Sequence, residues 1–308
     1  MIINKTYNMK VTFKELTEQY LLNADITNES KETYSRCVNV FKQWVVISGR
    51  NITELKRADI LAYKTHLSKT GKSDSTIELY LRVISKMYEY AENAGWYENI
   101  AAGIRIQNRN REYKRGHLSQ QETLLLLSSI DRSTIIGKRD FAIINLMLRC
   151  GLRCIEVARL RVCDLERTNK GGYLTIQRKG RLSRSEKIGI TLKSVEPIME
   201  YLDSVGFTGL SDSMFKTADA YPRPLRARTL GEIIAKRLKA CGLSSPKITA
   251  HSLRHTAAVL AILNKVPLKE VQSMLGHRSP ETTELYLKSI EAELRLDNPA
   301  GKALDDVF

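Results

Sequence analysis

Two arginines, two histidines and a tyrosine form a set in this chain that could handle a phosphate group. They are Arg153, His251, Arg254, His277 and Tyr286. Two guanidinium groups can bind the non-bridging oxygens of one phosphate bidentately, and an imidazole can donate or move a proton near neutral pH. A tyrosine hydroxyl beside such cations is a candidate nucleophile. The residue types therefore predict chemistry at a phosphodiester.

The spacing within the set supports this interpretation. His251 precedes Arg254 by three residues in HSLRH, which puts both side chains on one face of a helix. A glycine precedes His277, and Tyr286 follows it nine residues later. Together with Arg153 in the distant stretch RCGLRCIEVARL, the pattern resembles the tyrosine recombinase family, also called the phage integrase family. The resemblance covers nearly the whole chain.

The resemblance implies a reaction with a covalent intermediate. Tyr286 attacks the scissile phosphate of DNA, which creates a 3′-phosphotyrosyl link and a free 5′-hydroxyl, and a 5′-hydroxyl of a partner duplex reverses the step. Because the covalent link stores the energy of the broken bond, no ATP or other cofactor is expected. The motifs contain no carboxylate cluster at metal-binding spacing and no P-loop, so no metal site is expected either.

Two further residues take roles from the resemblance. Lys179, in QRKGRLSR, corresponds to a hairpin lysine that protonates the leaving 5′ oxygen, and Glu156 corresponds to a buttress of the first arginine. Considered alone, Lys179 is one phosphate-binding cation among several, and Glu156 forms an ordinary surface salt bridge with Arg153 one turn away.

Other side chains are expected to support the site or to contact DNA. His277, a position that is Trp in some relatives, is expected to hydrogen-bond the phosphate. His255 points about 100° away from Arg254 around the helix, so a supporting or purely structural role is expected. The candidate DNA-binding cations are Arg109, Arg111, Lys114, Arg115, Arg178, Arg181 and Arg184.

The chain is strongly basic, with 49 Lys and Arg against 34 Asp and Glu, a net charge of +15 and a pI near 9.6. Charge alone allows a nucleic acid, an anionic membrane or mere solubility. Residues 1–104 carry +2, residues 105–116 carry +4 and residues 117–308 carry +9. Double-stranded DNA with specific recombination sites is therefore the expected partner. The segment 105–116 is expected to be a basic linker that lets two domains close around a duplex, or else a solvated linker with no partner.

The composition also bears on the compartment. No apolar run approaches the roughly 18 residues of a membrane span, and the start MIINKTYNMK has no signal-peptide core, so a cytoplasmic protein without a membrane partner is expected. The five cysteines are an odd number without a CxxC pair, which predicts buried, reduced thiols. Cys150 and Cys154 flank Arg153, which leaves sensitivity to oxidation open.

The predicted fold is mainly α, with two domains. Residues 1–104 are expected to form a helical, SAM-like core DNA-binding domain. Residues 117–308 are expected to form a mostly α catalytic domain with a small antiparallel β-sheet, the fold of DNA breaking-rejoining enzymes. A free monomer or dimer and a homotetramer on two synapsed DNA sites are implied by the resemblance, with accessory DNA-bending proteins as further candidate partners.

The tail of the chain, about 294–308, is expected to contact a neighbouring protomer. Residues 302–308 carry a small apolar face that needs a groove, so docking in trans is expected; a disordered tail or docking on the same subunit is the alternative. A helical domain that begins by about residue 11 favours a simple integrase or a Xer-type resolvase over an arm-binding phage integrase.

Two other functions stay open at this stage. A type IB topoisomerase uses the same nucleophile chemistry, and a sequence-specific DNA-binding factor could retain the fold without activity. Nothing in the pattern distinguishes integration, excision and resolution, or a phage, a transposon and a chromosomal system.

Local patterns predict individual elements. In the first domain, Ser30 is expected to cap one helix, and Ser73 or Ser75 another that stops at Gly95. In the second, Ser119 and Glu122 match a capping box. Further expected elements are a helix over 138–149, a helix from about Arg153, a β-hairpin from 172–178 and 187–192, and helices from Thr229 onward that break at 242–246, 276 and 298–301.

Overall fold

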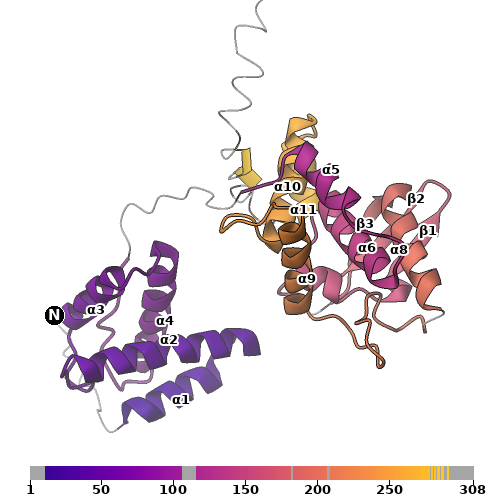
Figure 1. Ribbon diagram of the computed structural model, residues 1–308. Helices are drawn as coiled ribbons and strands as arrows, with labels where there is room; N and C mark the ends of the chain where they lie inside the picture. Colours follow the sequence, from indigo (N-terminus) through magenta and orange to yellow (C-terminus); the bar gives the residue numbers. More distant parts are fainter. Residues whose placement is uncertain are drawn as a thin grey trace, which may run out of the picture. The chain divides into compact units, whose positions relative to one another are not determined.

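The structure is a computed structural model that describes residues 11–105, 116–181, 183–206, 209–277, 279, 281, 283–284, 286–287 and 290. The chain divides into two compact units, Met1–Asn110 and Arg111–Phe308 (Figure 1). The division falls within the segment predicted to link two domains. Most of that segment and the tail 291–308 lie outside the described residues, and with them Arg109, Arg111, Lys114 and Arg115.

The described part of the first unit consists of helices α1 (Phe13–Asn23), α2 (Asn28–Ile47), α3 (Arg57–Lys69) and α4 (Asp74–Asn93). Ser73 caps α4, and Gly95, with φ +71°, follows its end, as predicted. The prediction that Ser30 caps α2 is wrong. Thr27 is extended, and its hydroxyl accepts from the Ser30 backbone N–H, so α2 begins three residues before the position predicted.

Apolar side chains of all four helices meet in one core. The rings of Phe41 and Tyr63 lie edge to face with centroids 4.9 Å apart, and Leu16, Ile60 and Ile84 are fully buried around them. The periodic apolar stripes of this unit therefore serve packing, which leaves the opposite, polar helix faces for any partner.

The second unit combines helices with one small sheet (Figure 1). Its elements in chain order are α5 (Gln120–Ser128), α6 (Ile135–Cys150), α7 (Cys154–Ala158), η1 (Val162–Asp164), β1 (Leu165–Thr168), β2 (Gly171–Ile176), β3 (Glu186–Thr191), α8 (Leu192–Val205), α9 (Ala227–Ala240), α10 (Ala250–Leu263) and α11 (Leu268–Leu275). The strands are antiparallel in the order β1-β2-β3, and Ile176 at the end of β2 pairs with Glu186 at the start of β3. The turn between these strands carries Lys179.

Helix α6 is central to this unit, because it packs against both α8 and α10. Its Ile143 and Leu146 are fully buried in a core that also includes Leu174 of β2 and Leu253 of α10. Gly151 ends α6 in the left-handed conformation, with φ +60°. The carbonyl of Gly151 accepts from Arg254 of α10, so the end of α6 is bonded to α10 close to the residues predicted to be catalytic.

Three features of this unit differ from the sequence predictions. Helix α6 begins at Ile135, three residues early, because the Thr134 hydroxyl accepts from the Gly137 N–H at 3.0 Å. Strand β1 was not predicted, since it is only four residues long and mostly exposed. Helix α8 was not predicted either, since Pro197 interrupts its pattern. The carbonyl of Lys193, which Pro197 cannot bond, accepts instead from the Asn145 side chain at 2.8 Å.

The cysteines are all free thiols, as predicted, but they are not all buried. Cys37 and Cys150 are buried, Cys154 and Cys241 are half-buried, and Cys163 is exposed. The prediction of buried thiols is therefore wrong for Cys163. Among the described residues, no helix is long and apolar enough to cross a bilayer.

Candidate active site

The first arginine of the candidate site lies at the junction of α6 and α7. Arg153 precedes α7, and the carboxylate of Glu156 accepts from both its backbone N–H and its guanidinium, each at 2.9 Å. Glu156 is fully buried, which by itself would raise its pKa. The Arg153 N–H and the charges of Arg153 and Arg178 outweigh this and lower the pKa, so the carboxylate stays ionised. The pair is therefore no ordinary surface salt bridge, because its carboxylate is fully buried while Arg153 stays a quarter exposed.

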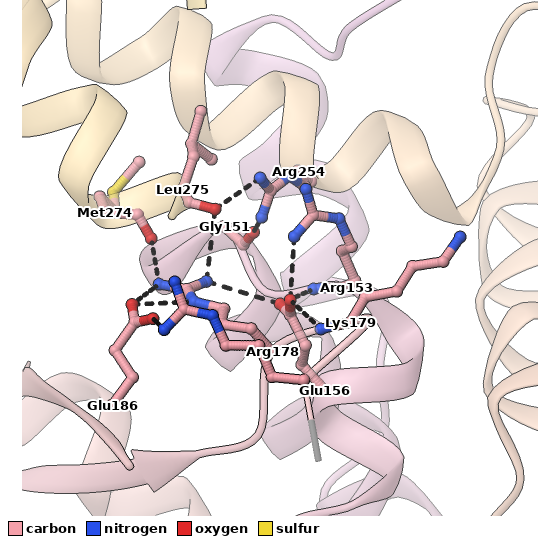
Figure 2. A network of polar contacts seen from close by, with 10 residues as sticks. Gly151, Arg153, Glu156, Arg178, Lys179, Glu186, Arg254, Met274 and Leu275 are labelled. Carbon is pink, nitrogen blue, oxygen red and sulfur yellow. Dashed lines mark hydrogen bonds and ion pairs between the residues drawn. The ribbon is translucent and has the colours of Figure 1, made fainter. Parts of the chain in front are cut away.

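The second arginine joins three elements. Arg254, on α10, is 1% exposed, and its guanidinium donates to the carbonyl of Gly151 at 2.7 Å and to that of Leu275 at 2.6 Å (Figure 2). Burial and the nearby charge of Arg153 lower the pKa of Arg254 to about 10, so the group still carries its charge at neutral pH. Two guanidinium groups are therefore held close together by backbone carbonyls and one buried carboxylate.

The hairpin turn reaches this network through its backbone. The N–H of Lys179 donates to Glu156 at 3.4 Å, while its side chain extends away from the network (Figure 2). Its neighbour Arg178 is 3% exposed and bonds to Glu186 and to the carbonyls of Met274 and Leu275. Arg178 was predicted to contact DNA; in the structure most of its side chain lies inside the domain, where each of its nitrogens has a protein partner.

The first histidine after the HSLRH motif is positioned by the end of α11. Gly276 ends this helix in the left-handed conformation, and the Nδ1 atom of His277 lies 2.8 Å from the hydroxyl of Thr283, which is buried. Burial, followed by the charges of Arg254, Arg153, Arg178 and His251, lowers the pKa of His277 to about 4. His277 is therefore neutral at pH 7 and can offer one N–H to an anion.

The predicted nucleophile lies against two imidazole rings. Tyr286 is 2% exposed; its ring stacks on that of His277 with centroids 5.8 Å apart and lies 4.9 Å from that of His255. His255 is fully buried, and its Nδ1 atom lies 3.3 Å from the carbonyl of Gly116. His255 thus packs against the ring of the tyrosine inside the domain.

An open cleft of about 580 Å³ lies over these residues. Its lining includes Arg153, Lys179, His277, Arg181 and the small exposed part of Arg178. Of the described DNA-binding candidates, Arg181 keeps 42% of its side chain exposed and lies 3.8 Å from Glu186. Arg184 is bonded to Asp164 at 2.7 Å and is only a quarter exposed.

The predicted set is therefore brought together, although not in one layer. Arg153, Lys179 and His277 line the cleft, whereas Arg254 and Tyr286 are buried and do not line it. His251, on the same helix as Arg254, is half-buried and close enough for its charge to act on His277. The arrangement can stabilise charge on a phosphate that enters the cleft, with a lysine ammonium beside it.

Sequence reasoning missed three side chains that hold this arrangement. They are Thr283, Arg178 as a buried residue, and Glu186. Thr283 lies six residues from His277, which does not place two side chains on one face of a helix, and Arg178 looks like one more basic residue of the turn. No group of three His, Cys, Asp or Glu that could hold a metal ion occurs among the described residues.

Both predicted domains match families of known proteins. Residues 117–293 match the family model "Phage integrase family", and residues 13–98 match "Phage integrase, N-terminal SAM-like domain". The tyrosine recombinase XerD of Listeria innocua is 26% identical over 272 residues, which are 86% of this chain and 89% of that protein. The tyrosine recombinase XerC of Caldanaerobacter subterraneus subsp. tengcongensis is 32% identical over 180 residues, 58% of this chain but only 49% of that protein.

Solved structures share the fold. XerH recombinase bound to palindromic difH substrate superposes with a TM-score of 0.71 at 20% identity, over 93% of this chain and 85% of that one. A lambda integrase (75–356) dimer bound to a COC′ core site gives 0.68 at 18% identity, over 90% and 95%. The topoisomerase and inactive-factor alternatives are not favoured by these matches. Since the integrase model alone covers more than half of the chain, the chain belongs to the phage integrase family and is a site-specific tyrosine recombinase of the Xer type.

Proposed function

We propose that Tyr286 is the nucleophile with which this recombinase cleaves DNA, through a covalent 3′-phosphotyrosine intermediate. The observation that carries the proposal is that four separate parts of the chain meet at one place: Arg153 and His277 line one cleft, Tyr286 stacks on His277, and Arg254 bonds to Gly151 beside Arg153. A phosphate in that cleft meets fixed cations before the reaction begins. Such preorganised charge is the main way in which enzymes stabilise the extra charge of a transition state.

Each residue of the site has a distinct part in this proposal. Arg153 and Arg254 bind the non-bridging oxygens of the scissile phosphate, and the neutral His277 donates its remaining N–H to the same group. His251, three residues before Arg254, supports this set from the same helix. Glu156 orients Arg153 through the bonds at 2.9 Å, and His255 packs against the nucleophile.

Lys179 is the proposed acid for the leaving 5′ oxygen. Its backbone is tied to Glu156, yet its side chain is directed away from the buried network (Figure 2). The same residue lines the cleft. A long stem with an ammonium at its end can follow a leaving group that no buried residue reaches. Arg181, which lines the same cleft, is proposed to contact a DNA phosphate beside it.

The proposed partner is double-stranded DNA with specific recombination sites, bound by two domains. We place the core-binding domain at 1–104, the basic linker at 105–116 and the catalytic domain at 117–308, with the DNA clamped between the two domains. A lambda integrase structure of the same fold is a tetramer bound to a Holliday junction, which supports a homotetramer on two synapsed sites here. The tail 302–308 is proposed to dock on the neighbouring protomer; it lies outside the described residues.

The substitution Tyr286→Phe tests the central role. The variant should bind a cognate DNA site with unchanged affinity, because the buried ring is retained, and it should form no covalent adduct, because the attacking oxygen is gone. A gel-shift assay measures the binding, and a denaturing gel with a nicked suicide substrate measures the adduct. An undiminished adduct in the variant would remove Tyr286 as the nucleophile.

A further inference from the structure

Arg178 is a basic residue of the hairpin turn that has almost no exposed surface. Its side chain is 4% exposed, whereas that of Arg181, three residues later in the same turn, is 42% exposed. Burying a guanidinium is costly unless every donor finds an acceptor. The contacts of Arg178 therefore indicate what its burial achieves.

One set of contacts closes the hairpin. The Nε and Nη2 atoms of Arg178 both donate to Glu186 Oε1, at 2.9 and 2.6 Å. Glu186 begins β3 and pairs in register with Ile176, the last residue of β2. The bond thus joins the two ends of the turn across its base, and the length of the turn that carries Lys179 is set at that point.

The other set anchors the closed hairpin to the domain. The Nη2 atom of Arg178 donates to the carbonyl of Met274 at 3.1 Å, and Nη1 to that of Leu275 at 3.4 Å (Figure 2). The Nη1 atom also lies 3.6 Å from Glu156 Oε2, and the other oxygen of Glu156 accepts from the Lys179 N–H. Arg178 therefore shares the carboxylate that orients Arg153 and the carbonyl that holds Arg254.

We infer that Arg178 is a positioning residue for the reaction: it fixes the hairpin turn to α7 and α11, so that the Lys179 ammonium is held at the leaving oxygen. The inference rests on the proposed role of Lys179. Besides this anchor, the described part of the turn is tied to the core by one long backbone hydrogen bond, that of Lys179 to Glu156, and by the bond of Arg184 to Asp164 five residues beyond Lys179. On a mobile turn, Lys179 could still donate a proton, but its ammonium group would no longer be held beside the leaving oxygen.

The substitution Arg178→Lys tests the inference. It keeps the positive charge beside Glu156 and Glu186 but removes the planar fork that reaches both of them and two carbonyls at once. Cleavage of an ordinary suicide substrate should slow by about 10- to 100-fold, the usual consequence of a misplaced catalytic group. Cleavage of a 5′-bridging phosphorothiolate, whose thiolate leaves without a proton, should recover at least about tenfold of that loss. DNA affinity and the melting temperature should change little.

A matched variant separates this role from that of any hairpin ion pair. Lys187 lies on β3 and pairs with Glu166 at 2.6 Å on the exposed face of the sheet. Lys187→Gln should therefore leave both cleavage rates unchanged. If Arg178→Lys does not fold, Glu186→Ala is the second variant, since Glu186 is a quarter exposed and its loss removes two of the same bonds. Its cleavage of the ordinary substrate should slow less than that of Arg178→Lys, and its cleavage rate should recover in the same way on the 5′-bridging phosphorothiolate.

The outcomes distinguish this inference from the proposed function. A wild-type chain that forms no covalent adduct contradicts the proposed function itself. If the wild type forms the adduct and Arg178→Lys cleaves equally fast, only the positioning role is overturned. A variant whose cleavage falls without recovery on the sulfur substrate, or falls only together with its melting temperature and DNA affinity, also overturns it, because its role is then structural.

Discussion

The side chains of the site differ in charge at neutral pH, and this difference follows from what surrounds each of them. Arg254 keeps its proton although burial lowers its pKa to about 10, whereas His277, with a pKa of about 4, does not. A neutral imidazole has one N–H and one acceptor nitrogen. Because the Nδ1 atom of His277 faces the hydroxyl of Thr283 at 2.8 Å, that hydroxyl can donate to Nδ1 and leave the proton on Nε2 for a phosphate.

This assignment leads to a prediction for Thr283→Val. Valine keeps the shape of the buried side chain but cannot donate to His277, so the tautomer with Nε2–H loses its support. The rate of adduct formation on a suicide substrate should fall by about tenfold, comparable to the loss of other residues that orient a histidine. Thr283→Ser, which retains the hydroxyl, should cleave close to the wild-type rate. Equal rates for the valine variant and the wild type would show that Thr283 has no such role.

At the level of elements, the end of α11 is a tightly constrained part of the site. Gly276 has φ +62°, and a Cβ atom there would lie 2.6 Å from Nε of Arg178, which is itself held by several bonds. Gly242, after α9, has φ +72° and nothing within 4 Å. Both glycines adopt a left-handed backbone conformation that disfavours other residues. Of the two, only Gly276 also has no room for a Cβ atom.

The comparison of Gly276→Ala with Gly242→Ala measures that second requirement. Gly242→Ala should lower the free energy of unfolding by about 1–2 kcal/mol, the cost of a left-handed alanine. Gly276→Ala should cost about 1–3 kcal/mol more, since Arg178 must also shift. Urea unfolding of both variants measures these free energies. Equal values for the two variants would mean that Arg178 can move aside without destabilising the protein.

For the molecule as a whole, the reaction depends on charge that the chain itself supplies. The net charge is +15, and the described cleft is lined by Arg153, Arg178, Lys179 and Arg181. Fixed guanidinium groups can balance the charge that develops on a phosphate, a task that a bound metal ion performs in other enzymes. The chain is therefore expected to work without added metal.

Chelation tests this expectation. In excess EDTA, adduct formation and rejoining should stay within about twofold of the untreated rate, because no step of the proposed reaction uses a metal ion. Single-turnover cleavage on a labelled suicide substrate is the measurement. Complete loss of cleavage that Mg²⁺ or Mn²⁺ restores would contradict the proposed mechanism, whereas an effect on strand exchange alone would concern the DNA junction.

Local sequence patterns were sufficient for much of the fold. The capping box of Ser119 and Glu122, the cap at Ser73 and the left-handed glycines at the ends of α6 and α11 depend on hydrogen bonds within a few residues. The mainly α fold with a small antiparallel sheet and the membership in the recombinase family also followed from the sequence, because helical spacing and the HSLRH pattern are local as well.

Only the tertiary structure decided how the site is held together. Arg178 reaches Leu275 across 97 positions, Arg254 reaches Gly151 across 103, and the Asn145 side chain meets the carbonyl that Pro197 frees in α8. In all three contacts the acceptor is a backbone carbonyl oxygen, which every residue type possesses. In two of them that carbonyl belongs to a glycine or to the residue before one. The sequence does not indicate which backbone carbonyls are available as such acceptors. Arg178, which the sequence predicted to bind DNA, is therefore a buried residue whose partners only the folded structure identifies.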